Sequence, residues 1–238
     1  MKLPPIAPSA LEQSSSQHTS DLLQQVDLFD FEMTGITAMH PNYLYHNARI
    51  DHPWVVMIGV VHDYTQISAA PHDIAGVEVL RQYGRAMRGA LEIATWIRNR
   101  GFDAEPHTRP LADKLLMIPP DIACGFGELG KHGSIINAEY GSNFRRSAVT
   151  TSMPLEPTTA SPIWVDDFCT KCHICEDACP REAILPEKQW VRGQQKWHVD
   201  FDKCIPFFNE NFGCAMCIAQ CPWSIPGTAP RLSQKIAR

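Results

Sequence analysis

Eight of the nine cysteines of this 238-residue chain lie in its last third, in two runs whose spacing could bind metal clusters. The first run reads Cys169-x2-Cys172-x2-Cys175-x3-Cys179-Pro180. The second run has Cys204, then a nine-residue gap, then Cys214-x2-Cys217-x3-Cys221-Pro222. A triplet of close thiolates followed by a Cys-Pro step is the pattern that holds four-iron cubanes. The two runs therefore predict two 4Fe–4S clusters and a role in electron transfer.

The expected ligand sets are interleaved between the two runs. In proteins with two such clusters, the fourth cysteine of each run binds the cluster of the other run. We therefore expect one cluster on Cys169, Cys172, Cys175 and Cys221, and the other on Cys204, Cys214, Cys217 and Cys179. Two zinc sites or four disulfides are the alternatives. Zinc favours separated Cys-x2-Cys pairs, which a triplet with a Cys-Pro step does not match.

Composition indicates an ordinary soluble globular protein, with 44% hydrophobic and 20% charged residues. The net charge of −5 gives no electrostatic reason to expect nucleic acid or an anionic membrane as a partner. Residues 1–20 carry no export signal, and the longest apolar run, Trp54 to Val61, is far shorter than a membrane helix of about 20 residues. Thiolate ligands also fit a reducing compartment. We expect a cytoplasmic protein without a membrane partner.

Local patterns predict an α+β core in the first two thirds of the chain. The run from Trp54 to Val61 predicts a buried strand. Apolar residues at three- and four-residue steps predict a long helix that begins after Pro71 and has Arg98 and Arg100 in its last turn. Gly101 is then available as the residue that ends the helix. Weaker strand patterns follow at residues 102–105, 135–136 and 148–151.

The predicted organisation has three parts. Residues 1–24, rich in Ser, Pro and Gln, are expected to form a flexible arm. Residues 25–160 form the core, and the Pro- and Thr-rich segment 153–162 reads as a linker. Residues 161–238 form the cluster domain.

A glycine-rich segment, residues 124–155, precedes the linker. Its Gly125-x-Gly127-x-x-Gly130 matches the dinucleotide fingerprint in form. It follows Pro119-Pro120-Asp121 instead of a clear strand, and no helical pattern begins behind it. This context argues against nicotinamide or flavin binding through the fingerprint.

Together with the cysteine runs, this segment resembles the cobalamin-dependent reductive dehalogenases and, less closely, the epoxyqueuosine reductases. Those proteins carry a GLGELGR-like loop, an ITPEYG-like turn, an arginine and TDLPL before two clusters. Here the counterparts are GFGELGKHG, IINAEYG, Arg145 and TTSMPL. The helix that contains Tyr83 and the closing CAMCIAQCPWS are also similar. The resemblance covers about residues 54–224.

The resemblance implies a nitroreductase-like α/β core that binds a corrinoid, followed by a two-cluster ferredoxin-like domain that reduces it. It assigns cofactor-binding positions to Gly125, Gly127, Gly130, Lys131 and Tyr140. It also implies that Tyr83 donates a proton and that Arg145 supports it. This pairing is chemically sensible, because a tyrosine has an unperturbed pKa near 10 and an adjacent guanidinium favours the phenolate.

Several alternatives remain open at the level of sequence. Tyr83 could be a core residue of its helix. Cys124 is expected to be a small buried hydrophobic residue, with a reactive thiol or an axial ligand as the alternatives. The histidines of the N-terminal half (40, 46, 52, 62 and 72) fit no metal motif and are expected on the surface or in packing. The whole chain could be an electron carrier or subunit that binds no corrinoid, or its core could hold another tetrapyrrole or a flavin.

The expected partners follow from these readings. We expect a low-potential electron donor such as a ferredoxin or flavodoxin, and a small-molecule substrate. In the carrier alternative, a partner subunit takes the place of the substrate.

Overall fold

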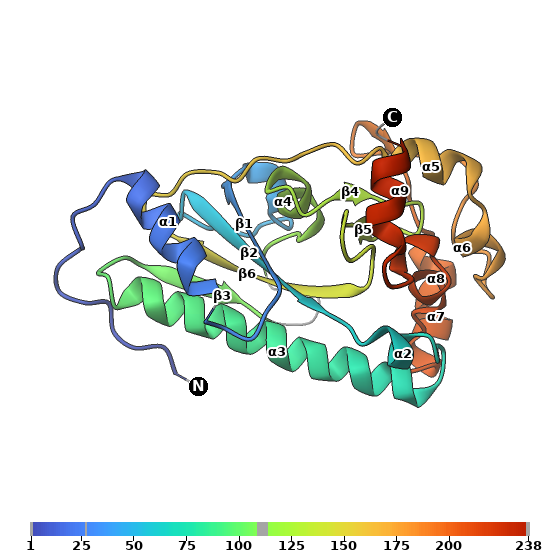
Figure 1. The fold of residues 1–238 in the computed structure, drawn as a ribbon, viewed down its shortest axis with the longest axis horizontal. Coiled ribbons are helices and arrows are strands. Elements are labelled where there is room, and N and C mark those ends of the chain that lie inside the picture. Colours follow the sequence, from blue (N-terminus) through green and yellow to red (C-terminus); the bar gives the residue numbers. More distant parts are fainter. Residues whose placement is uncertain (1, 27, 109–113, 237–238) are drawn as a thin grey trace. The chain divides into compact units, whose positions relative to one another are not determined.

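The computed structural model describes residues 2–26, 28–108 and 114–236 (Figure 1). These residues form two compact units. Unit 1 comprises Met1–Val61, Gln82–Phe126 and Arg145–Ala160. Unit 2 comprises His62–Arg81, Gly127–Phe144 and Ser161–Arg238. The last segment of unit 2 begins at Ser161. Residues 62–81 and 127–144, expected within the core, instead group with the cysteine segment.

A four-stranded sheet with the order β1-β2-β6-β3 is the centre of unit 1. Its strands are β1 (Met33–Ala38), β2 (Trp54–Val61), β3 (Ala104–His107) and β6 (Phe144–Thr151). β1 runs antiparallel to β2 and β3 runs antiparallel to β6. The expected strand at Trp54–Val61 is confirmed, with six consecutive buried residues inside it.

Strand β1 has no counterpart among the sequence predictions. Its sequence, MTGITA, lacks a run of apolar β-branched residues and contains Gly35. That glycine is required by packing, because an added Cβ would lie 2.6 Å from the Sγ of Cys124. A close approach between distant residues leaves no local pattern in the sequence.

Helix α3 (Asp73–Arg98) confirms the predicted long helix, and Gly101 after it has a φ of +82°. Its second half packs small residues, Ala86 and Ala90 among them, against the sheet residues Ile58 and Val60. Small side chains allow the helix to lie close to the sheet.

The first half of α3 differs from the predicted apolar stripe. Ile74, Val77 and Leu80 are exposed, and Glu78 is fully buried in their place. The Glu78 carboxylate accepts hydrogen bonds from the backbone N–H of Asp63 at 2.8 Å and from Arg81 at 2.6 Å. A buried carboxylate is tolerated when it is paired in this way, so Glu78 can occupy the buried face of the helix.

The N-terminal segment also differs from prediction. Residues expected to form a flexible arm contain helix α1 (Ser15–Val26), and Leu22 is fully buried in the core of unit 1. Ahead of it, the N–H of Ala7 bonds to the carbonyl of Arg98. A few anchoring contacts order a segment whose composition is mostly polar.

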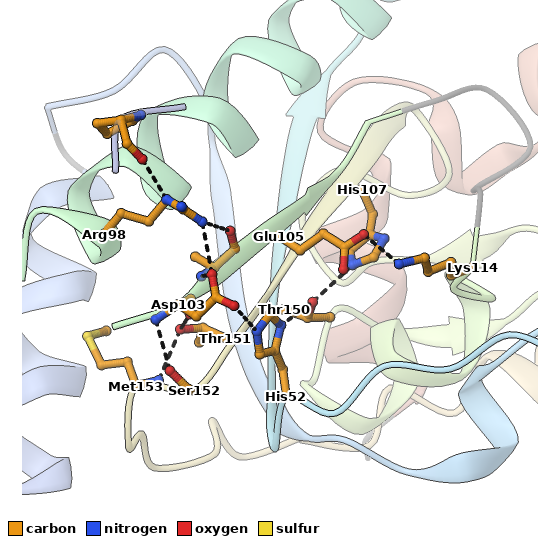
Figure 2. A network of polar contacts seen from close by, with 12 residues as sticks. His52, Arg98, Asp103, Glu105, His107, Lys114, Thr150, Thr151, Ser152 and Met153 are labelled. Carbon is orange, nitrogen blue, oxygen red and sulfur yellow. Dashed lines mark hydrogen bonds and ion pairs between the residues drawn. The ribbon is translucent and has the colours of Figure 1, made fainter. Parts of the chain in front are cut away.

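A polar network ties the edge strand of the sheet to its neighbours (Figure 2). The hydroxyl of Thr150 on β6 lies 3.0 Å from a ring nitrogen of His52 and 3.0 Å from one of His107 on β3. His52 also contacts the carboxylate of Asp103 at 3.2 Å, which in turn accepts a hydrogen bond from Arg98 at 2.9 Å. The network joins β3, β6, the end of α3 and the segment before β2.

Shorter elements complete the described chain. Those of unit 1 are η1 (Pro41–Tyr43) and α4 (Ile118–Ala123). Those of unit 2 are α2 (Tyr64–Ile67), β4 (Glu128–Leu129), β5 (Ile135–Ile136), α5 (Val165–Lys171), α6 (Ile174–Asp177), β7 (Gln189–Val191), β8 (Gln194–Lys196), α7 (Phe201–Glu210), α8 (Met216–Ala219), η2 (Pro222–Ser224) and α9 (Thr228–Ile236).

Two groups of buried residues enclose the cysteines of unit 2. One contains Cys169 and Cys221 together with Trp197 and Trp223. The other contains Cys175, with Cys179, Cys204 and Cys217 packed against it. Across the described ranges, none of the helices has the length and apolar character that a bilayer crossing requires.

Candidate redox site

One set of four thiols forms around Cys221. Burial, followed by the nearby Cys169 and Cys172, raises the pKa of the Cys221 thiol to about 12. Burial also raises the pKa of Cys175, and its largest electrostatic neighbours are Cys221 and Cys169. Cys221 belongs to the second run of the sequence, yet its neighbours are the triplet of the first run.

The other four thiols form the second set. Burial, and then Cys214, Cys179 and Cys204, raise the pKa of Cys217 to about 12. The pKa of Cys204 is raised by burial and then by Cys179 and Cys214. Cys179 therefore sits with the second triplet, as the interleaved ligand sets require.

This arrangement of thiols fits two iron–sulfur clusters. Buried thiolates that crowd one another are unfavourable unless a cation binds them, so this grouping of thiols suits iron–sulfur ligation. Backbone N–H groups also donate to the sulfurs. The N–H of Ala183 lies 3.4 Å from the sulfur of Cys179, and the N–H of Met216 bonds to Cys214. The N–H groups of Trp223 and Ser224 bond to the sulfur of Cys221. Such bonds stabilise cluster thiolates.

A zinc site requires its ligands to converge on one ion. Within the part of the chain that the structure describes, no group of three or more histidine, cysteine, aspartate or glutamate side chains is placed to hold a single metal ion.

The GELG loop, residues 127–130, packs on the cysteine segment within unit 2. The carboxylate of Glu128 accepts hydrogen bonds from the N–H groups of Ile163 and Val165, both at 2.8 Å, where helix α5 begins. Helix α5 carries Cys169, so Glu128 positions a cysteine of the first run. Sequence reasoning missed Glu128, because a cap supplied from 35 residues away has no local pattern.

Lys131, expected to bind the cofactor, lies against the first cysteine run. Its Nζ donates a hydrogen bond to the carbonyl of Cys172 at 3.0 Å and forms an ion pair with Glu176. Its backbone N–H bonds to the sulfur of Cys169. The ammonium of Lys131 is therefore paired with groups of the first cysteine run.

The expected cofactor glycines have local packing roles. An added Cβ at Gly130 would lie 2.7 Å from the side chain of Ile136, and one at Gly127 would lie 2.0 Å from the carbonyl oxygen of Ile136. Gly125, in unit 1, has a φ of +86°. Tyr140 is half-buried, and its N–H bonds to the Asn137 side chain at 3.1 Å. Corrinoid contact by these residues stays a prediction.

Tyr83 and Arg145, the expected catalytic pair, are brought together within unit 1. Nη1 of Arg145 donates a hydrogen bond to the Tyr83 hydroxyl at 3.3 Å, and its Cζ lies 4.4 Å from the ring centroid. Burial lowers the pKa of Arg145, and Tyr83 counteracts this shift. The guanidinium is thus held in a poorly hydrated position against the phenol.

Two further sequence predictions concern Cys124 and the histidines. Cys124 is buried, donates weakly to the carbonyl of Asp121 at 3.4 Å, and has a pKa raised chiefly by burial. Nearby, burial raises the pKa of Asp121 to about 7 despite its ion pair with Arg146. His52 takes part in packing contacts and His46 is exposed, in line with the expected surface and packing roles.

Comparison with known proteins is consistent with this geometry. A family model described as a 4Fe-4S dicluster domain matches residues 168–225. The tetrachloroethene reductive dehalogenase of Dehalobacter restrictus is 31% identical over 183 residues, which is 71% of this chain and 33% of that protein. The epoxyqueuosine reductase of Leadbetterella byssophila is 32% identical over 117 residues, 42% of this chain and 34% of that protein.

Solved structures share the fold. A reductive dehalogenase, whose structure is described in terms of B12-dependent dehalogenation, matches with a TM-score of 0.86 and 21% identity, over 98% of this chain and 36% of that one. An epoxyqueuosine reductase from Streptococcus thermophilus matches with a TM-score of 0.61 and 16% identity, over 86% of this chain and 65% of that one.

The matched dicluster model supports iron–sulfur chemistry in residues 168–225 of the chain. The relatives and the solved structures together support a reductive dehalogenase/epoxyqueuosine reductase-like family, as the sequence resemblance predicts. The chain spans about a third of the length of the tetrachloroethene reductive dehalogenases it matches.

Proposed function

We propose that the chain passes electrons through two 4Fe–4S clusters to a corrinoid, for the reductive conversion of a small molecule. In this proposal the clusters are held by the two interleaved sets of cysteines, and unit 1 supplies a nitroreductase-like core. The cytoplasmic location and a ferredoxin or flavodoxin as the donor are parts of the same proposal.

The observation that carries the proposal is the contact between Arg145 and Tyr83. A phenol that bonds to a buried guanidinium is suited to give up its proton, because the positive charge stabilises the phenolate that remains. Reduction of an organic substrate requires such a proton in addition to electrons.

The residues around the pair fit an additional group. Nε of Arg145 is buried and makes no hydrogen bond within the described part of the chain. A buried donor without a partner is costly, so an acceptor on a cofactor or substrate would satisfy it. A bound corrinoid would supply the metal-centred reduction, while Tyr83 holds the proton and Arg145 orients the phenol.

A second candidate function is an electron-transfer subunit that binds no corrinoid. It is favoured by the positions of Gly130 and Lys131, which are accounted for by packing on Ile136 and on the first cysteine run. Under this alternative, the GELG loop serves only to hold the cluster segment, and unit 1 docks a partner protein.

Corrinoid retention distinguishes the two functions. Anaerobically purified protein with full iron content is incubated with cobalamin and dialysed to equilibrium, and its visible spectrum is recorded before and after reduction. The proposal predicts a retained, base-off cobalt spectrum that responds to reduction through the clusters. Protein with intact clusters that retains no corrinoid but binds another chain stably would establish the carrier function instead.

A further inference from the structure

Lys131 is a buried cation beside the first cysteine run. Its side chain is 1% exposed, and its Nζ lies 3.0 Å from the carbonyl oxygen of Cys172 and in an ion pair with Glu176. The ammonium also lies 4.9 Å from the centroid of the Trp197 ring. Burying an ammonium costs free energy unless the surrounding groups compensate for it. The buried position of Lys131 therefore depends on these contacts.

We propose that Lys131 and Glu176 form a charge pair that sets the reduction potential of the cluster on Cys169, Cys172, Cys175 and Cys221. The inference rests on the two-cluster part of the proposed function. It assigns to the lysine of the GELGK loop a role toward the cluster in addition to the corrinoid contact that the family resemblance implies.

Lys131 stabilises negative charge at the cluster in two ways. Its backbone N–H donates to the sulfur of Cys169, and its buried ammonium lies 3.0 Å from the carbonyl oxygen of Cys172 in the same cysteine run. When the cluster accepts one electron from the donor, it gains one negative charge and no bond is made or broken. A positive charge and a hydrogen bond at the sulfur both favour this reduced form, and so raise the potential.

Glu176 acts in the opposite direction. Its carboxylate forms an ion pair with Lys131 and also contacts Nδ1 of His173 at 3.0 Å. Glu176 is the next residue after Cys175, a ligand of this cluster in the proposal. A fixed carboxylate at this position disfavours the reduced cluster, so Lys131 and Glu176 oppose each other.

A structural role alone would make a different prediction. The pair also fastens the GELG loop to helix α6, and loss of that contact would loosen the cluster site whichever partner is removed. Both single substitutions would then act in the same direction. Control of the potential by charge requires shifts of opposite sign.

The test is an EPR-monitored redox titration of the full chain, purified anaerobically, as wild type, Lys131→Met, Glu176→Gln and the double variant. Each single change is expected to alter the equilibrium constant for reduction of this cluster by about tenfold, which is about 59 mV for a one-electron couple. Lys131→Met should lower the potential, Glu176→Gln should raise it, and the double variant should lie near wild type.

Lys188 provides the matched control. Its Nζ lies 5.4 Å from the centroid of the same Trp197 ring and 2.5 Å from the carboxylate of Asp166, and among the described residues it makes no hydrogen bond to a cysteine. Lys188→Met should therefore shift the potential much less. Lys131→Arg keeps the charge and should keep the potential, even if Lys131→Met fails to fold.

The outcomes separate this inference from the proposed function. Shifts of the same sign in the two single variants, an equal shift in Lys188→Met, or unmoved potentials with full iron content would overturn the inference alone. Wild-type protein without two clusters would overturn the inference together with the two-cluster proposal.

Discussion

Arg145 contacts Tyr83 both at the hydroxyl and across the ring face. The hydrogen bond from Nη1 to the phenol oxygen is 3.3 Å long, and Cζ lies 4.4 Å from the ring centroid, between residues 62 positions apart in the chain. A planar guanidinium can make both contacts at once, which the ammonium of a lysine cannot. The contact orients the phenol and places positive charge where a phenolate would form.

Substitution of Tyr83 by phenylalanine tests whether this phenol donates the proton. General acid catalysis typically contributes about 10²- to 10⁴-fold, so substrate reduction should fall by about that factor. Volume is nearly conserved and one hydrogen bond is lost, so the free energy of unfolding should change by about 1 kcal/mol. The measurement is steady-state turnover alongside the rate of cluster reduction, which should stay normal.

Tyr43→Phe is the matched control, because it removes a phenol from a half-buried tyrosine of the same unit with no assigned role. Unchanged turnover in Tyr83→Phe would contradict the proton-donor assignment. Arg145→Lys should also reduce turnover, since a flexible ammonium does not reproduce the stacked guanidinium.

Substitution of Cys179 by serine tests the interleaving of the ligand sets. Cys179 follows the first triplet in sequence, but its thiol lies with Cys204, Cys214 and Cys217. We expect Cys179→Ser to damage the cluster held by that second set and to leave the first cluster's EPR signal intact. Cys172→Ser should give the reverse pattern. Loss of the signal of the first cluster in Cys179→Ser would show that each run binds its own cluster.

Thr150 tests the polar network at the edge of the sheet (Figure 2). Its hydroxyl is fully buried and contacts His52 and His107, both at 3.0 Å. Thr150→Val keeps the shape but removes the shared partner, so the free energy of unfolding should fall by about 1–3 kcal/mol. Thr150→Ser keeps the hydroxyl and should lose less. Equal losses in the two variants would mean that the methyl group, and not the hydrogen bonds, matters at this position.

His132 should make stability dependent on pH. Burial lowers the pKa of its imidazole to about 4, and its ring accepts the N–H of Ser134 and contacts the hydroxyl of Ser142. A folded-state pKa below the unfolded value of about 6.5 gives stability that is present above pH 6.5 and lost as the pH falls toward 4. Between pH 7.5 and 5.5 this loss amounts to about 1 kcal/mol.

Thermal unfolding measures this effect. The melting temperature of wild type should fall by about 2–4 °C more than that of His132→Asn over the same pH range, since asparagine does not titrate. Parallel falls in the two proteins would assign the pH dependence to other groups.

The elements that the sequence predicts are those with a local pattern. The strand at Trp54–Val61 and the helix that ends before Gly101 follow from a β-branched run and from a C-terminal glycine. Strand β1 and helix α1 lack such patterns, because Gly35 and Leu22 owe their positions to contacts with distant residues.

The site shows the same division between local and distant effects. Cysteine spacing alone predicts the two thiol sets, and the family resemblance predicts the pairing of Tyr83 with Arg145. The sequence does not predict that Glu128 caps helix α5 or that Glu176 pairs with Lys131, because both contacts form only in the folded chain. Their partners lie about 35 to 45 residues away in sequence, which is too far for a local sequence motif to predict the contact.

The most direct test of the central claim is the iron and acid-labile sulfide content of anaerobically purified protein. Two cubanes bound by the eight cysteines predict about eight iron and eight sulfide per chain, together with EPR signals of two interacting reduced clusters. Four iron per chain, or zinc in place of iron, would contradict the account.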